Sequence, residues 1–369
     1  MESIIGHEDL LRELRSLAAS NDPPHALLFA GPEGTGRSTL ALEYARLLNC
    51  ETLHGRPSVP APAPAGMFDD EVMPNAASSE GGPCRTCRAC RLISDGTHPD
   101  VIRLGPGDAL CRPRSSDSGH ARHPDSRDIR ICQVRGLIEL AAKFPYEART
   151  RVILVDPAER MNREGANTLL KTLEEPPGHS VFVLISAAPE SLLETVISRC
   201  RRVDVRTVPR GVIEAGLALR GVAPELALRA ARESHGRPGK AIAFAKQPDL
   251  MDDRLRLLDR CARVAVQRAS ERISRVPSMV ENWRQDRSVL LGELDAWEAY
   301  WESRLRFAAE SGDRGDARDA LRALDAVTLG RADLQANVQV RLTMELMLLS
   351  FPRVTLSAIT SEEVPASHA

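Results

Sequence analysis

The chain has 369 residues, which is too long for one ordinary hydrophobic core and suits two or three domains. Apolar residues make up 43% of the sequence and aromatic residues only 4%, so we expect helical cores of Leu, Val and Ala. The net charge of -2 argues against a protein that binds nucleic acid unaided, because such proteins carry a basic excess. The chain contains no apolar run of about 18 residues and no basic flank before an apolar N-terminal stretch, so we expect a cytoplasmic protein without membrane contact.

The first 207 residues alternate short β-rich runs with helical patterns, which is typical of a parallel sheet covered by helices. Apolar residues at helical spacing predict helices through residues 131–141 and 166–173. Pro176-Pro177-Gly178 is expected to end the second of these helices. The expected strands are 26–30, 101–104, 151–155, 181–186 and 202–205.

Two stretches interrupt this pattern and are expected to be surface insertions, near 53–83 and near 105–127. A small helical segment is expected at 208–248 and a helical bundle at 249–356, and residues 357–369 are expected to be a disordered tail. Two apolar stripes are expected to form the core of the bundle. They are Leu290, Leu294, Trp297, Trp301 and Leu305, and Val338, Leu342, Leu346 and Leu349.

A glycine-rich loop, Gly31-Pro32-Glu33-Gly34-Thr35-Gly36-Arg37-Ser38, follows the first expected strand and opens a helix. This is the context of a Walker A phosphate loop, in which Gly31, Gly34 and Gly36 let backbone N–H groups close around phosphate. Arg37 stands where the motif has lysine, and its guanidinium is larger and differently shaped than an ammonium group. Two readings stay open, a site for ATP and a loop that only turns from strand to helix.

The strand expected at 151–155 is followed by Asp156, which is where such a site places a ligand for magnesium. Pro157 then stands in the place of the acid that would orient the attacking water. Proline has no side chain able to polarise water. The sequence therefore disfavours ATP hydrolysis by this chain and leaves the binding of ATP and magnesium open.

Cys84, Cys87 and Cys90 give two overlapping C-x-x-C spacings, and Cys50 is available as a fourth thiol. In a reducing compartment, clustered cysteines indicate metal ligands before disulfides. Four thiolates form a closed tetrahedral site for structural zinc, whose role is in folding. An iron–sulfur cluster is the chemical alternative, and free thiols are another.

Several motifs together resemble the clamp-loader subunits of bacterial DNA polymerase III. They are Ile5-Gly6-His7, the glycine loop, the cysteine cluster, the run from Asn167 to Pro177 (Asn-Thr-Leu-Leu-Lys-Thr-Leu-Glu-Glu-Pro-Pro), and Ser198-Arg199-Cys200. The resemblance covers residues 1 to about 248. It implies an α/β AAA+ fold over 1–207, with a RecA-like parallel sheet and a zinc module near 50–90. It further implies a small helical lid over 208–248 and an all-α collar domain for oligomerisation over 249–356.

Within this family the gamma/tau subunits hydrolyse ATP, and delta-prime subunits are largely rigid partners with altered phosphate loops. Arg37, Pro157 and Gly239, which aligns with the place of the second sensor arginine, indicate the delta-prime type. The resemblance implies gamma/tau and delta subunits as partners, with the sliding clamp and primed DNA reached through the complex. A polymerase activity would belong to that complex, because nothing in this sequence resembles a polymerase active site.

The resemblance also implies a role for Arg199, which would reach the γ-phosphate of ATP bound by a neighbouring gamma/tau subunit. Such an arginine finger acts in trans, because its planar, permanently charged fork suits charge spread over phosphate oxygens. A surface arginine at the edge of a strand is the plain alternative. Two other functions stay open, an active gamma/tau-type ATPase and a stand-alone nucleotide switch or kinase built on the same loop.

Overall fold

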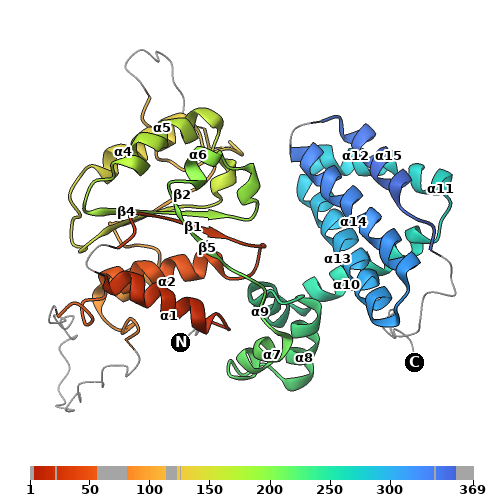
Figure 1. Ribbon diagram of the computed structural model, residues 1–369, viewed down its shortest axis with the longest axis horizontal. Helices are drawn as coiled ribbons and strands as arrows, with labels where there is room; N and C mark the ends of the chain where they lie inside the picture. The colour runs from red at the N-terminus through yellow and green to blue at the C-terminus, as the bar shows by residue number, and fades with distance from the viewer. Residues whose placement is uncertain are drawn as a thin grey trace. The chain divides into compact units, whose positions relative to one another are not determined.

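The computed structural model describes residues 4–20, 23–55, 81–113, 123–124, 126–335 and 338–354. Most of the insertion expected near 53–83, part of the one near 105–127, and the expected tail at 357–369 lie outside these residues. The chain divides into two compact units, Met1–Ala245 and Lys246–Ala369 (Figure 1). The finer division expected at residues 207 and 248 stays a prediction.

A five-stranded parallel sheet in the order β2-β3-β4-β1-β5 forms the centre of the first unit (Figure 1). Strands β1, β3 and β4 are buried at every position, which explains why their sequences are continuous apolar runs. All five strands lie where the sequence predicts them, within one residue at each end. They are β1 (Ala26–Ala30), β2 (Val101–Leu104), β3 (Arg151–Val155), β4 (Ser180–Ser186) and β5 (Arg201–Asp204).

Helices cover both faces of this sheet (Figure 1). Successive residues of β1 point to opposite faces, so Leu27 and Phe29 share a core with Leu40, whereas Leu28 shares one with Leu169. The first face carries α1 (Glu8–Ala19) and α2 (Arg37–Asn49), and the second carries α4 (Ile131–Ala141), α5 (Arg163–Glu174) and α6 (Glu194–Ile197). This layering confirms the predicted α/β class, a parallel sheet covered by helices on both faces. The remaining short elements are α3 (Arg88–Ser94), η1 (Ala158–Arg160) and η2 (Pro189–Ser191).

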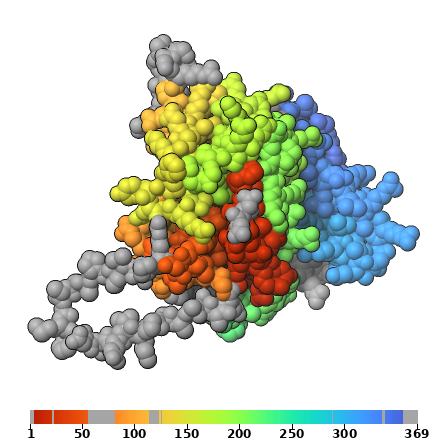
Figure 2. Space-filling model, turned by 60° about the vertical axis from the view of Figure 1, so that its left-hand side comes forward, coloured from red at the N-terminus to blue at the C-terminus, as the bar shows by residue number. Residues whose placement is uncertain are grey.

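Three short helices follow β5: α7 (Arg210–Ala218), α8 (Pro224–Glu233) and α9 (Pro238–Lys246). The N-terminal segment packs against this part of the chain, because a Cβ at Gly216 would lie 2.8 Å from the side chain of Ile5. Likewise, a Cβ at Gly6 would meet the side chain of Val208 at 2.7 Å. Figure 2 shows the red N-terminal surface adjoining the green surface of these helices. The small helical segment is therefore joined to the first unit through the N-terminus.

The described part of the second unit is helical, as predicted. Its first apolar stripe forms the core, since Leu290, Leu294, Trp297 and Trp301 are buried and Leu305 packs against them. The helices are α10 (Pro248–Ala265), α11 (Ala269–Ile273), α12 (Val276–Gln285), α13 (Arg287–Ser311), α14 (Arg314–Gln335) and α15 (Val340–Ser350). No helix in the described ranges is long and apolar enough to cross a membrane.

The second predicted core stripe is wrong. Its members remain between 40% and 55% exposed: Val338, Leu342, Leu346 and Leu349. Helix α15 instead buries Met344, Met347 and Leu348. Both faces of this helix carry apolar residues, and spacing alone could not decide which face packs inward.

Candidate functional site

The phosphate loop connects β1 to α2 at the carboxyl edge of the sheet. Its glycines Gly31, Gly34 and Gly36 have φ angles of 155°, 82° and 103°. A Cβ at Gly31 would lie 2.1 Å from the carbonyl oxygen of Val205, so packing alone requires glycine there. Gly36 caps α2, and no atom lies within 4 Å of the place of its Cβ. The backbone of a phosphate site is therefore retained.

Two distant parts of the chain hold this loop in place. At the start of α9, the Gly239 N–H donates to the carbonyl oxygen of Gly34 at 2.8 Å, and a Cβ at Gly239 would come within 3.0 Å of that oxygen. At the N-terminus, His7 Nε2 donates to the carbonyl oxygen of Thr35 at 2.8 Å. Gly239 thus lies against the loop but brings no side chain to it. His7 was noted only as part of a motif, and its contact with the loop was not predicted.

Positive side chains gather at the loop. The Cγ of Lys240 lies 3.0 Å, and the Cβ of Arg237 3.5 Å, from the place of a Cβ on Gly34. The Nη1 atom of Arg37 is buried and has no hydrogen-bond partner within the described residues. The first N–H groups of α2 attract anions, and basic residues close to the loop act in the same direction. The arrangement is compatible with a phosphate group.

Asp156 follows β3 and contacts the loop. Its Oδ2 accepts a hydrogen bond from Ser38 Oγ at 2.8 Å. The same oxygen accepts one from Arg103 Nη2 at 2.6 Å, and Arg103, on β2, was not predicted to be part of the site. A guanidinium therefore already balances the charge of Asp156. Arg103 would therefore compete with a magnesium ion for this oxygen of Asp156.

The residue after Asp156 is Pro157, so this position carries no acid. The next carboxylate along the chain is Glu159 on η1. Its Oε1 accepts a hydrogen bond from the Ala187 N–H at 3.1 Å, and its Oε2 is buried without a partner in the described part of the chain. This side chain is therefore engaged at the end of β4. Glu159 lies three residues past Asp156, and the motif spacing did not single it out.

Ser198-Arg199-Cys200 lies between α6 and β5. The guanidinium of Arg199 donates from Nε to Glu174 Oε1 at 2.8 Å, and Nη2 donates to the same oxygen. Its Nη1 donates to the carbonyl oxygen of Thr195 at 2.7 Å. The Arg199 side chain is still 31% exposed. Glu174 belongs to the run from Asn167 to Pro177, and its pairing with Arg199 does not follow from that motif.

The two residues beside Arg199 have structural roles. Ser198 caps the end of α6, and its Oγ lies 3.4 Å from Arg199 Nη1. Cys200 packs against the sheet core, and burial raises the pKa of its thiol to about 12. A thiol with so high a pKa stays protonated and is a poor nucleophile. The observed contacts of Cys200 are packing contacts with the sheet core.

The phosphate loop and Arg199 are separate regions. Within the described residues, Arg199 makes no hydrogen bond or ion pair with the loop or with Asp156. The structure thus brings Gly31, Gly34, Gly36, Arg37, Ser38 and Asp156 together in one place and sets Arg199 in another.

Cys50, Cys84, Cys87 and Cys90 come together, with their sulfur atoms within 4.8 Å of one another. The Cys84 N–H donates to Cys50 Sγ at 3.3 Å, and the Cys87 N–H donates to Cys84 Sγ at 3.3 Å. A hydrogen bond with Cys90 lowers the pKa of Cys50 to about 4, and the same contact raises the pKa of Cys90. Sulfurs around one tetrahedral zinc, at about 2.3 Å each, would be roughly 3.8 Å apart. The cluster therefore fits a single ion.

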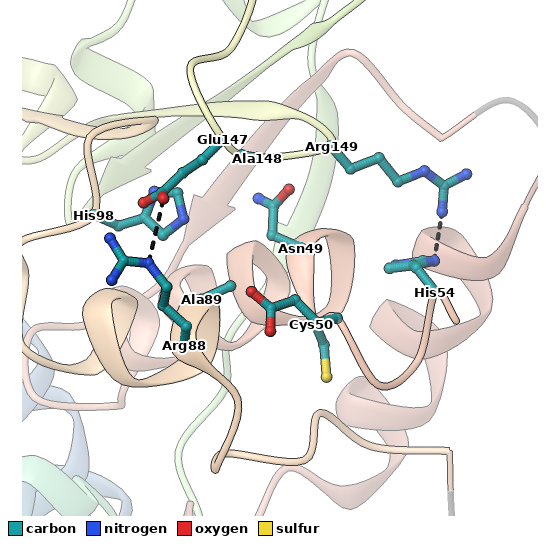
Figure 3. A pocket seen from close by; sticks show the side chains of 10 residues that line it. Asn49, Cys50, His54, Arg88, Ala89, His98, Glu147, Ala148 and Arg149 are labelled. Carbon is teal, nitrogen blue, oxygen red and sulfur yellow. Dashed lines mark hydrogen bonds and ion pairs between the residues drawn. The ribbon is translucent and has the colours of Figure 1, made fainter. Parts of the chain in front are cut away.

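A cavity of about 290 Å³ lies beside the cysteine cluster (Figure 3). Arg88 and Glu147 form an ion pair of 3.3 Å across it, and Arg149 contacts His54. Cys50 and Ala89 also line the cavity, and none of the loop residues predicted to bind nucleotide does. Its lining mixes positive and negative groups, so it shows no preference for an anion or a cation. These pairs tie the cysteine module to the segment before β3.

Comparison with known proteins identifies relatives. Residues 6–209 match the family described as DNA polymerase III, delta subunit. The chain is 36% identical over 176 residues to DNA polymerase III subunit delta' of Pseudomonas aeruginosa, covering 48% of this chain and 41% of the relative. It is 28% identical over 236 residues to subunit delta' of Bacillus subtilis, covering 63% and 57%. It is 32% identical over 208 residues to subunit tau of Bacillus subtilis, covering 56% and 29%. The alignments thus span less than two thirds of these relatives.

Solved structures with low similarity were also found. A gamma subunit-related protein of Thermotoga maritima gives a TM-score of 0.38 at 17% identity, covering 92% of this chain and 97% of that chain. RuvB of Thermotoga maritima gives a TM-score of 0.42 at 14% identity, covering 94% and 87%.

Proposed function

Because the chain belongs to the DNA polymerase III delta subunit family, we propose that it is a non-hydrolysing, delta-prime-like subunit of a clamp loader. Such a loader uses ATP bound by other subunits to place a sliding clamp on primed DNA during replication. The observation that carries the proposal is Arg199, which is partly exposed and separate from the chain's own phosphate loop. An arginine finger in trans needs both properties.

The state of the chain's own loop supports the non-hydrolysing assignment. Asp156 is charge-balanced by Arg103 and hydrogen-bonded to Ser38, and Pro157 supplies no acid. Hydrolysis requires an oriented water and stabilised phosphate charge, and the first requirement has no group in the expected place. The loop can keep the backbone conformation of a phosphate site and can at most bind an anion.

The chemistry of Arg199 is that of a charge-stabilising group. In phosphoryl transfer, negative charge spreads over the equatorial oxygens, and a permanently charged guanidinium with a free N–H can donate a hydrogen bond to them. Lysine in the same place would supply charge without the fork. The residue therefore fits the stabilisation of a transition state on another subunit.

The cysteine cluster supports a structural zinc ion as part of this proposal. Four close sulfurs leave no ligand position for water, so the ion would serve folding and would not take part in catalysis. An iron–sulfur cluster interposes several iron and sulfide atoms between its thiolates and holds them farther apart. The cysteine geometry thus favours zinc over its chemical rival.

The exposed stripe of the second unit supports oligomerisation through a helical collar. Leu342, Leu346 and Leu349 on α15 are between 47% and 55% exposed, and Leu321 and Leu329 on α14 are 49% and 64% exposed. Exposed leucines gathered in this way are typical of surfaces that bind other proteins. We assign this surface to the contact with gamma/tau and delta subunits.

Reconstitution tests the proposal. A loader assembled with the Arg199→Ala variant should bind the clamp and primed DNA, but its ATP turnover should fall by about 10³-fold. Arg199→Lys should recover only a small part of that loss, because the fork is missing. Unchanged turnover in the Arg199→Ala loader would falsify the proposal.

An active gamma/tau-type ATPase is the second candidate, because the loop backbone is intact and Arg37 Nη1 has no hydrogen-bond partner in the described part of the chain. The distinguishing measurement is ATP hydrolysis by the purified chain alone. Hydrolysis that disappears in Asp156→Ala would establish this candidate, and its absence would support the delta-prime type.

A further inference from the structure

Most N–H groups of the Arg199 guanidinium are used in hydrogen bonds within its own chain. A guanidinium side chain has five N–H groups. The Nε and one Nη2 hydrogen are directed to Glu174 Oε1, and Nη1 is directed to the Thr195 carbonyl oxygen and, at 3.4 Å, to Ser198 Oγ. One N–H on Nη2 is used by no hydrogen bond within the described residues. The side chain is therefore anchored along its Nε edge and retains a donor at its far end.

Glu174 provides this anchor from a rigid element. It is the last residue of α5, whose first turn is capped by Asn162, with its Oδ1 accepting from the Gly165 N–H at 2.9 Å. Leu169 and Leu173 on the same helix are fully buried in the sheet core. A carboxylate at the C-terminus of a helix is disfavoured by the helix dipole, and a cation beside it relieves this. The position of Glu174 is thus set by the core.

We propose that Glu174 is a positioning residue for Arg199, which fixes the guanidinium so that its remaining donor faces a phosphate on a neighbouring subunit. This inference rests on the proposed function. An unanchored arginine samples many rotamers, and ordering them on binding is costly. Anchoring the Nε edge in advance removes part of that cost and sets the orientation of the fork.

Glu174 could instead restrain Arg199, and removing its carboxylate would then change kcat in the opposite direction. If Glu174 restrained Arg199, removing the carboxylate would free the guanidinium and raise ATP turnover. If Glu174 positions Arg199, removing it lowers kcat while the KM for ATP and the assembly of the loader stay unchanged. The sign of the change in kcat therefore separates positioning from restraint.

The test uses the complete reconstituted loader with clamp, primed DNA and ATP. Glu174→Ala should lower kcat by about tenfold. Loss of a strong exposed ion pair is worth about fivefold, and misplacement of a catalytic group about a hundredfold, so the expected effect lies between them. Glu174→Gln should recover most of this loss, since its amide oxygen still accepts from Nε and Nη2. Glu175→Ala is the matched control, because Glu175 adjoins Glu174 at the end of the same helix and should leave kcat unchanged.

The outcomes separate this inference from the function on which it rests. If Arg199→Ala lowers turnover but Glu174→Ala leaves it within about twofold of wild type, or raises it, the positioning role is wrong and the function stands. A loss in Glu174→Ala that Glu174→Gln does not recover also overturns the positioning role. If Arg199→Ala itself has no effect, both the function and the positioning role fail.

Discussion

The phosphate loop and the Arg199 region adjoin the same sheet but differ in which of their functional groups are present. The loop keeps its glycine backbone, while the groups that chemistry needs are altered: Arg37 replaces lysine, Pro157 follows Asp156, and Arg103 contacts that aspartate. The Arg199 region keeps its arginine and surrounds it with partners from its own chain. The difference indicates that a fold can retain the backbone of one site for its shape while it retains the side chain of another for its chemistry.

Removal of the proposed zinc ion should have the largest effect on stability. Stripping zinc with a chelator, or changing Cys84→Ser, should cost the cysteine module at least about 5 kcal/mol, because structural zinc sites supply much of the folding free energy of small modules. Proteolysis rates at residues 81–95 and the zinc content by mass spectrometry would measure this. Cys111→Ser, outside the cluster, is the control. A module as resistant without metal as with it would contradict the structural role.

The structural role of the phosphate loop can be tested by substituting two of its glycines. Gly31→Ala should cost about 3 kcal/mol of unfolding free energy, because its Cβ would lie 2.1 Å from a carbonyl oxygen. Gly36→Ala is the matched variant, with positive φ but open space, and should cost only about 1 to 2 kcal/mol. Denaturant unfolding measures both. Equal costs would mean that packing against Val205 does not fix the loop.

A substitution at Asp100, which lies outside the phosphate loop and the Arg199 region, should change stability but not ATP turnover. Burial acts to raise the pKa of Asp100, but N–H groups of Glu147, Ala148 and Tyr146 and the Arg151 guanidinium outweigh it and lower the pKa to about 2. A carboxyl group with a lowered native pKa stabilises the fold above its unfolded pKa, and this stabilisation is lost as the pH falls from about 4 to about 2.

Asp100→Asn should therefore cost about 2 kcal/mol at neutral pH and flatten the stability profile below about pH 4. Urea unfolding at a series of pH values measures it. The ATP turnover of a loader containing this variant should equal that of wild type. A parallel loss of stability in variant and wild type below pH 4 would show that Asp100 is not the titrating group.

The smallest expected effect concerns Arg103. Arg103→Ala should expose Asp156 to magnesium, so binding of a fluorescent ATP analogue should become about tenfold tighter with magnesium than with a chelator. The wild-type chain should show no such dependence on the metal. Magnesium dependence in the wild-type chain would show that Arg103 does not occupy the place of the cation.

The sequence predicted the α/β unit well because buried parallel strands and their helices have strong patterns. The strands, the loop, Asp156 and the four cysteines lie where residue type and spacing indicated. Leu342 and Leu346 were misplaced into the core, because α15 has two apolar faces and only packing decides between them. The surface that those leucines form could therefore be seen only in three dimensions.

The side-chain contacts made by Asp156 and Arg199 could not be predicted from the sequence. Arg103 meets Asp156 because β2 and β3 are neighbours in the sheet, with Arg103 opposite Leu154 in the register. Glu174 meets Arg199 because α5 ends beside α6. Each pair joins residues at least 25 positions apart, and no local spacing encodes such a pairing. Motifs thus locate functional residues, whereas their partners depend on topology.

The most direct test of the central claim compares two variants in one loader. ATP turnover is measured on clamp and primed DNA with this subunit carrying either Arg199→Ala or Asp156→Ala. We predict a loss of about 10³-fold for Arg199→Ala and no more than a twofold change for Asp156→Ala. The reverse pattern, with Asp156 essential and Arg199 dispensable, would contradict the account.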